Sequence, residues 1–164
     1  ECDAVVTSGG VSVGEHDLVK AAFESLGGVV DFWRVAIKPG KPLCVGRAQA
    51  VHVLGLPGNP ASASLTFTLF GLPLLRALQG DAAPLPQRLG VRVSGSLRRR
   101  PGRTEFLRAR LEVANSELTA RILPNQASGA VTSFAEAEAL VIVPAERDRV
   151  DEGDRMEAIR LRDA

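Results

Sequence analysis

Three short segments of the chain carry residue types that bind anions. The first, residues 7–15, follows an apolar run and contains Gly9, Gly10 and Gly14. Glycines at such a place let backbone N–H groups approach a phosphate. Gly9 and Gly14 have the spacing of a P-loop, but residues 15–16 are Glu-His where Lys and then Ser or Thr are required. The segment therefore predicts either a phosphate-binding turn or a plain strand-to-helix connection.

The second segment, residues 38–42, places two ammonium groups on a turn stiffened by proline. Of the 20 basic residues, 17 are Arg, and the three lysines are Lys20, Lys38 and Lys41. A chain that uses Arg elsewhere but keeps two lysines here indicates a need for compact cations. Such a turn could hold phosphates at low entropic cost, although a solvated loop with ordinary lysines is the alternative.

The third segment, residues 57–60, opens a helix. Asn59 is a candidate N-cap and Pro60 suits the first helical position. The first N–H groups of this helix, together with Ser62, could bind a second anionic group or a pterin. Ordinary helix capping also explains Asn59 and Pro60.

The histidines, Asp17 and the cysteines give weaker indications of a functional site. His16 and His52 are far apart and lack a metal-ligand pattern. Asp17 suits either a helix N-terminus or a Mg²⁺ ligand, since Mg²⁺ bound with phosphates uses one or two carboxylates. The two cysteines form no CxxC, so neither a disulfide framework nor a zinc site is predicted, and a reduced cytoplasmic setting is expected.

Alternating strands and helices must position the three segments. We predict strands at 4–7, 29–37, 43–45 and 51–54, and helices at 17–26, 60–70 and 74–78, with a kink or break at Gly71 and Pro73. In an open α/β sheet, ligands bind at the carboxyl ends of the parallel strands. We therefore expect the three loops to form one site.

A change of pattern predicts two domains. Residues 81–86 contain two alanines and two prolines, show no periodicity, and are predicted to be a linker between residues 1–80 and 87–164. Strands predicted at 88–95, 104–113, 117–122, 139–143 and 155–161 make the second part a small all-β domain.

Composition excludes several classes of protein. The chain has 164 residues, 45% hydrophobic and 24% charged, with a net charge of +1. This excludes a disordered tail and gives no general attraction to nucleic acid or membranes. No apolar run approaches the 18 residues typical of a membrane span. The chain opens at Glu1 directly into a strand-like run, which suggests a start inside a domain.

The three segments together resemble the molybdopterin molybdenumtransferase family, which includes bacterial MoeA, the E domain of gephyrin and the plant Cnx protein. The resemblance rests on residues 8–17, 32–42 and 55–62, and continues more loosely through 101–103, 106–108 and 126–128. It implies part of a three-layer, doubly wound α/β sheet followed by a small barrel-like β domain.

The resemblance implies the last step of molybdenum cofactor synthesis. Members of this family insert molybdate into adenylylated molybdopterin and release AMP. Mg²⁺ supports the chemistry, and the enzymes are cytoplasmic homodimers whose site uses both subunits. An adenylyltransferase partner is possible, whereas nucleic acid and membrane are not expected.

The family's site residues transfer by position. Asp17, Lys38 and Lys41 become the catalytic set, with Asp17 near Mg²⁺ and both lysines holding anionic groups of the substrate or molybdate. Arg34 stands where lysine is expected, which keeps the charge and changes the geometry. The binding residues implied are Ser8, Gly9, Gly10, Gly14, Arg34, Pro57, Gly58, Asn59, Pro60, Ser62, Arg108 and Ser128.

Family members are much longer and carry N-terminal domains and acidic residues that have no counterpart here. We therefore expect this chain alone to be catalytically incompetent. Two relatives, molybdopterin adenylyltransferase and the competence-damage family, share the α/β domain, but the β domain after Pro86 argues against both. A scaffold or partner-binding module is a different alternative, although Asp17, Lys38 and Lys41 favour catalysis.

Overall fold

A computed structural model describes residues 2–11 and 18–161, and the chain divides into two compact units. The first unit contains Glu1–Val35 and Gly40–Pro84, and the second contains Ala36–Pro39 and Leu85–Ala164. The division after Pro84 lies inside the predicted linker. The sequence did not predict that residues 36–39 belong to the second unit, where they pair with a β strand.

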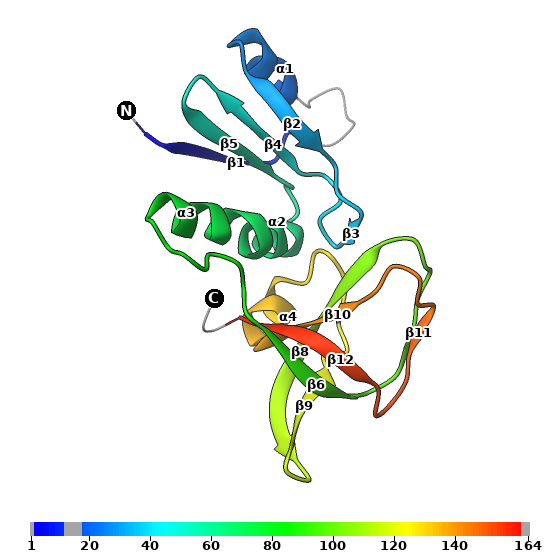
Figure 1. The fold of residues 1–164 in the computed structure, drawn as a ribbon. Helices are drawn as coiled ribbons and strands as arrows, with labels where there is room; N and C mark the ends of the chain where they lie inside the picture. Colours follow the sequence, from blue (N-terminus) through cyan, green and yellow to red (C-terminus); the bar gives the residue numbers. More distant parts are fainter. Residues whose placement is uncertain (1, 12–17, 162–164) are drawn as a thin grey trace. The chain divides into compact units, whose positions relative to one another are not determined.

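The first unit is built on a four-stranded sheet in the order β1-β5-β4-β2 (Figure 1). The strands are β1 (Ala4–Ser8), β5 (Val51–Leu56), β4 (Cys44–Ala48) and β2 (Val29–Trp33). β1 and β5 are parallel, whereas β4 is antiparallel to both of its neighbours. The carboxyl ends of β1 and β5 therefore meet at one edge of the sheet.

Helices cover both faces of this sheet, which makes three layers. Leu54 and Leu56 of β5 pack against Ala63, Phe67 and Phe70 of the long helix. On the other face, Phe23 of α1 (Leu18–Ser25) lies so close that a Cβ added at Gly46 would be 2.8 Å from its ring. Gly46 is thus required for the close approach of α1.

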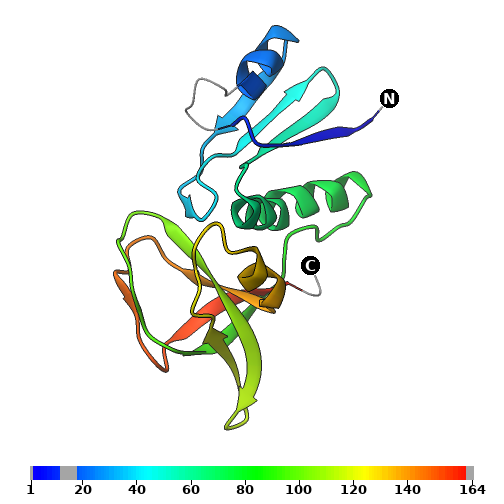
Figure 2. The same cartoon turned by 180° about the vertical axis from the view of Figure 1, so that it is seen from behind.

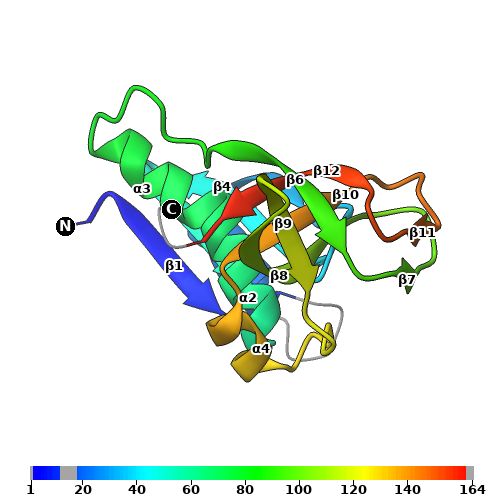
Figure 3. The same ribbon diagram turned by 90° about the horizontal axis from the view of Figure 1, so that it is seen from below.

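The long helix continues past Gly71 and Pro73, so of the predicted kink or break the break does not occur. α2 (Pro60–Thr66) passes through a π-helical segment, Phe67–Gly71, into α3 (Leu72–Leu78) (Figure 3). A Cβ on Gly71 would lie 2.3 Å from the Phe67 ring. Glycine therefore lets the wider π turn close over this ring, and Pro73 follows directly after the π turn, at the start of α3.

The same helix, Pro60–Leu78, is long and apolar enough to cross a membrane by length and composition, with a mean hydropathy of 1.3. Core helices of globular domains meet this criterion too. Ala61 and Leu65 are almost fully buried, as in a core helix.

The second unit is a closed barrel of five strands. β6 (Arg88–Ser94), β8 (Thr104–Ala114), β9 (Glu117–Ile122), β10 (Ala139–Val143) and β12 (Arg155–Arg160) follow the order β10-β12-β6-β9-β8, and β8 pairs with β10 to close the ring. β8 and β9 also form a hairpin that extends beyond the barrel (Figure 2). This confirms the predicted α/β class with a barrel-like β domain.

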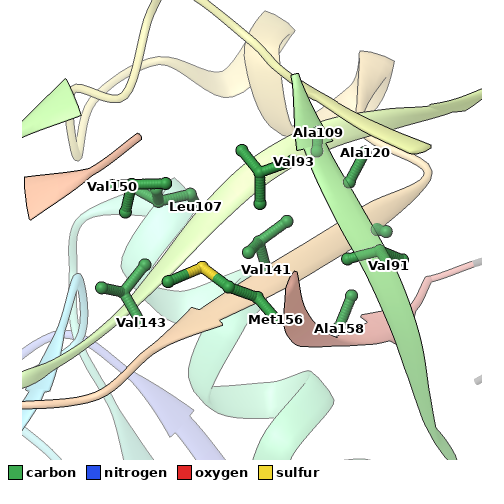
Figure 4. Close-up of a cluster of buried hydrophobic side chains, with 11 residues drawn as sticks. Val91, Val93, Leu107, Ala109, Ala120, Val141, Val143, Val150, Met156 and Ala158 are labelled. Carbon is green, nitrogen blue, oxygen red and sulfur yellow. The ribbon is translucent and has the colours of Figure 1, made fainter. Parts of the chain in front are cut away.

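Alternate residues of these strands fill the barrel. Val91 and Val93, Leu107 and Ala109, and Val141 and Val143 point inward, as strand periodicity requires (Figure 4). The interior is therefore a packed hydrophobic core.

Short elements were not predicted. They are β3 (Ile37–Lys38), β7 (Leu97–Arg98), α4 (Val131–Glu136) and β11 (Arg149–Val150). The strand predicted at 29–37 ends at Trp33, because Arg34 has a φ of 72°, outside the extended region.

Candidate functional site

The loop after β1 turns sharply on two glycines. Gly9 and Gly10 have φ values of 85° and 68°, a conformation that residues with a Cβ avoid. The N–H of Gly9 donates to the carbonyl of Leu56 at 3.0 Å, which ties the loop to the end of β5. Ser8 is exposed at the end of β1. The predicted residues Gly14 and Asp17 lie outside the described residues.

The loop after β5 lies directly against this glycine loop. A Cβ added at Gly58 would lie 3.4 Å from the Cα of Gly9. Pro57 is buried, while Gly58 is exposed. The structure therefore brings two of the three predicted segments together, at the edge where parallel strands end.

Asn59 occupies the N-cap of the long helix, as predicted, with extended φ and ψ of −75° and 123°. Its side chain makes no capping hydrogen bond. The cap is held by the backbone, where Ala63 N–H donates to the Asn59 carbonyl at 2.8 Å. Pro60 is at the start of the helix, and Ser62 is buried in its first turn. Since the Asn59 side chain does not accept from the N–H groups of the first helical turn, another acceptor can bind them.

Trp33 connects the glycine loop to Arg34. The indole Nε1–H donates to the carbonyl of Val11 at 3.1 Å, and the Arg34 guanidinium carbon lies 4.3 Å from the centre of the indole ring. Arg34 N–H also donates to the Leu43 carbonyl at 2.8 Å. Trp33 was not among the predicted site residues. The sequence feature that could have indicated this role is the position of Trp33 at the end of an apolar strand, directly before the cation Arg34.

The two lysines of the second segment lie in different units. Lys41 is in the first unit, where its carbonyl accepts from the N–H of Val35 at 3.1 Å. Lys38 belongs to β3 of the barrel, where it is paired in register with Glu105 of β8. The expectation that residues 38–42 form one turn is wrong, because strand pairing takes Lys38 out of it.

Lys38 is part of a charged cluster in the barrel. Its Nζ lies 2.8 Å from Glu105 Oε1, and the other carboxylate oxygen of Glu105 lies 2.8 Å from Arg99 Nε. The Lys38 side chain is 48% exposed, whereas those of Glu105 and Arg99 are 5% and 1% exposed. Only the lysine of this cluster is open to a ligand.

Arg108 is 2% exposed and holds a loop. Its Nη2–H donates to the carbonyl of Ala127 at 3.0 Å and its Nη1–H to that of Ala130 at 3.4 Å, while its backbone N–H donates to Gln126 Oε1 at 3.0 Å. Burial lowers the pKa of Arg108. These bonds give Arg108 a structural role, and its contact with substrate stays a prediction.

The loop fixed by Arg108 carries Ser128, which is exposed. Gln126 supports the same loop, because its Nε2–H₂ donates to the carbonyls of Arg108 at 2.9 Å and Leu123 at 2.7 Å. Residues 105 and 108 are separated by an odd number along β8, so they face opposite sides of the barrel wall. The Lys38 cluster and the Ser128 loop are therefore separate features of the barrel.

A hollow of about 480 Å³ lies in the first unit between α1 and the sheet. Val5, Phe23 and Val53 are among the mainly apolar residues that line it, and none of the predicted site residues within 2–11 and 18–161 does. It belongs to the packing of α1 rather than to the anion-binding loops.

Within residues 2–11 and 18–161 there is no group of three or more His, Cys, Asp or Glu that could hold a metal. Mg²⁺ bound together with phosphates uses only one or two carboxylates, a smaller set than such a group. The predicted ligand Asp17 lies outside the described residues, so a site at Asp17 stays a prediction.

Two family models match the chain in succession. Residues 1–77 match a probable molybdopterin binding domain, and residues 91–161 match the MoeA C-terminal region, domain IV. The order agrees with the two units of the structure.

Named relatives match nearly the whole chain. A molybdopterin molybdenumtransferase from Haemophilus influenzae is 35% identical over 94% of this chain and 38% of its own length. The molybdenum cofactor synthesis protein cinnamon from Drosophila melanogaster is 40% identical over 87% of this chain and 24% of its own. The chain thus spans less than two-fifths of either relative.

A solved structure of the molybdopterin biosynthesis moea protein from Pyrococcus horikosii has a TM-score of 0.75 with this chain at 35% identity. The alignment covers 96% of this chain and 37% of that one. The similarity includes both the α/β unit and the barrel.

Proposed function

We infer that this chain, which belongs to the MoeA and gephyrin family of molybdenum cofactor biosynthesis proteins, forms part of a molybdopterin molybdenumtransferase. The proposed reaction inserts molybdate into adenylylated molybdopterin and releases AMP. The observation that carries this proposal is the contact between the loops of Gly9 and Gly58, at the edge where two parallel strands end.

The loops of the first unit suit the phosphates of such a substrate. Turned glycines expose backbone N–H groups, and the start of a long helix adds a favourable dipole. Arg34, stacked on Trp33, and Lys41 supply positive charge in the same unit. We propose that Ser8–Gly10, Pro57–Pro60 and Ser62 surround the phosphate or pterin groups while these two cations neutralise the charge.

The barrel contributes a separate cation. Molybdate is a tetrahedral dianion, and the exposed ammonium of Lys38 is a compact donor suited to an oxyanion. We propose that Lys38 binds molybdate or another anionic group of the substrate. Arg108 then acts by holding the loop on which Ser128 is presented.

Several finer features are proposed from the family alone. They are a Mg²⁺ ion at Asp17, a homodimeric enzyme, a cytoplasmic location, a possible adenylyltransferase partner, and the absence of nucleic acid and membrane as partners.

The test uses the protein in its native length and measures both the binding of adenylylated molybdopterin and the release of AMP from it with molybdate present. Lys41→Ala is expected to weaken substrate binding. Arg47→Ala removes another cation of the same unit, one that pairs with Asp31 at 3.7 Å, and is the matched control. Equal affinity in wild type and Lys41→Ala would remove Lys41 from the site. A native protein that binds partners but releases no AMP would favour a scaffold.

A further inference from the structure

A carboxylate that the proposed site does not include lies beneath Lys38. Glu105 is 5% exposed in its side chain and contacts two cations, one through each oxygen. It shares the inward side of β8 with Leu107 and Ala109, at the end of the barrel where β3 joins. A buried carboxylate is costly unless it is paired, so this arrangement needs a physical explanation.

Arg99 explains why Glu105 keeps one orientation. Its Nε–H donates to Glu105, its Nη1–H donates to the carbonyls of Pro144, at 2.9 Å, and Arg147, and its Nη2–H donates to that of Arg103. With 1% of its side chain exposed, Arg99 has no surface for a ligand. It is an anchor that fixes one oxygen of Glu105.

The other oxygen of Glu105 is therefore fixed as well, and it faces Lys38. The backbone register places Lys38 opposite Glu105, and the ion pair of 2.8 Å sets the end of the lysine side chain. A lysine ammonium has three N–H donors. One points to Glu105, which leaves two for a ligand on the exposed side.

The charges of the cluster also favour the binding of an anion at Lys38. Arg99 and Lys38 together carry two positive charges and Glu105 carries one negative charge. The buried pair of Arg99 and Glu105 is neutral, so the net positive charge of the cluster lies on the exposed lysine. An anion thus meets one cation held in a defined place.

We propose that Glu105 is a positioning residue, which holds the Lys38 ammonium ready for an oxyanion of the molybdate type. This proposal rests on the function proposed for Lys38. It assigns Glu105 no contact with the substrate, since Glu105 acts through the lysine.

The first test changes the position of the carboxylate at residue 105 and keeps its charge. Glu105→Asp keeps the carboxylate but shortens its reach by one methylene, so it cannot contact both cations as glutamate does. In the native-length protein, titration with sodium molybdate and sodium tungstate is expected to show an affinity lower by about tenfold. Glu112→Gln removes an exposed carboxylate from the same strand, where it pairs with Arg121 at 2.7 Å, and is expected to leave the affinity unchanged.

A double-mutant cycle shows whether Glu105 acts through the lysine. In a Lys38→Ala background, Glu105→Asp is expected to have no further effect on oxyanion affinity, although it still lowers thermal stability. An equal loss of affinity in both backgrounds would overturn the positioning role, as would unchanged affinity in Glu105→Asp alone. If Lys38→Ala itself leaves the affinity unchanged, the function proposed for Lys38 fails first.

A measurement on the unaltered protein covers the case in which Glu105→Asp does not fold. Nitrogen-15 relaxation of the Lys38 ammonium is expected to show restricted motion and slow proton exchange. A freely rotating ammonium at Lys38 contradicts the proposal.

Discussion

The Cα of Gly9 and the Cβ that an alanine would carry at position 58 are separated by 3.4 Å. The two loops therefore meet through their backbones, with no side chain between them. Side-chain chemistry at this edge comes from the neighbouring Ser8, Asn59 and Arg34. Backbone amides and a few flanking polar groups are the usual composition of a phosphate site.

Gly9→Ala is expected to lower both stability and substrate binding. A Cβ at φ 85° costs about 1–2 kcal/mol, and relief of this strain would move the loop. Gly80→Ala is the matched control, since Gly80 has φ 84° and nothing within 4 Å of its added Cβ. Urea unfolding should show similar losses of stability for both variants, whereas only Gly9→Ala should weaken binding of adenylylated molybdopterin.

Trp33→Phe is expected to release the glycine loop while keeping an aromatic ring beneath Arg34. It removes the hydrogen bond from Nε1 to the Val11 carbonyl, which contributes about 1 kcal/mol. Binding of adenylylated molybdopterin, followed by calorimetry, should weaken. Ser25→Ala removes a side-chain hydrogen bond of the same kind, to the Ala22 carbonyl, and should leave binding as it is.

Arg108→Met is expected to destabilise the barrel by about 1–3 kcal/mol, because carbonyls of the loop lose their donors in a buried place. Arg110→Met on the same strand breaks an exposed pair with Glu136, which contributes at most about 1 kcal/mol. Thermal unfolding of the two variants distinguishes these values. A loss at Arg108 no greater than that at Arg110 would contradict the structural role of Arg108.

Acid should weaken the turn that precedes β12. A hydrogen bond from the backbone N–H of Asp151, with help from Arg147, lowers the pKa of Asp154 below its ordinary 3.8. A carboxyl whose pKa is lower in the folded state stabilises the fold above its unfolded pKa, and this contribution is lost as the pH falls through the folded pKa. The loss is therefore expected below about pH 3.8.

Asp154→Asn should show less of this acid dependence in urea unfolding at pH 7 and at a pH below the ordinary pKa of aspartate. Asp151→Asn keeps the backbone N–H that Asp154 accepts from, and serves as the control. Equal acid dependence in wild type and Asp154→Asn would show that other groups are responsible.

The long elements could be predicted because their signals are periodic. The apolar run of β10 and the alternation of charged and apolar residues over 108–113 of β8 indicate strands, and Asn59-Pro60 marks the start of a helix. The strand β3 has only two residues, which is too short to show an alternating pattern. It forms only because β8 offers a partner, and it takes Lys38 into the barrel.

The contact of the Gly9 and Gly58 loops agrees with the expectation from strand order, because parallel β1 and β5 are neighbours. The roles of Trp33, Glu105 and Gln126 were missed, since each depends on a partner at least 18 residues away in the chain. Of the kink or break expected at Gly71, the break does not occur, and here the contact responsible is local. The ring of Phe67 fills the space that a glycine leaves.

The chain crosses between its two units three times, after Val35, after Pro39 and after Pro84. The barrel is thus a discontinuous domain, and no single cut releases it whole. A piece beginning at Leu85 would lack β3, leave Glu105 with Arg99 as its only cation in the cluster, and expose an unpaired stretch of β8. During synthesis, residues 36–39 leave the ribosome long before β8, so β3 can join the barrel only after its partner strand has been made.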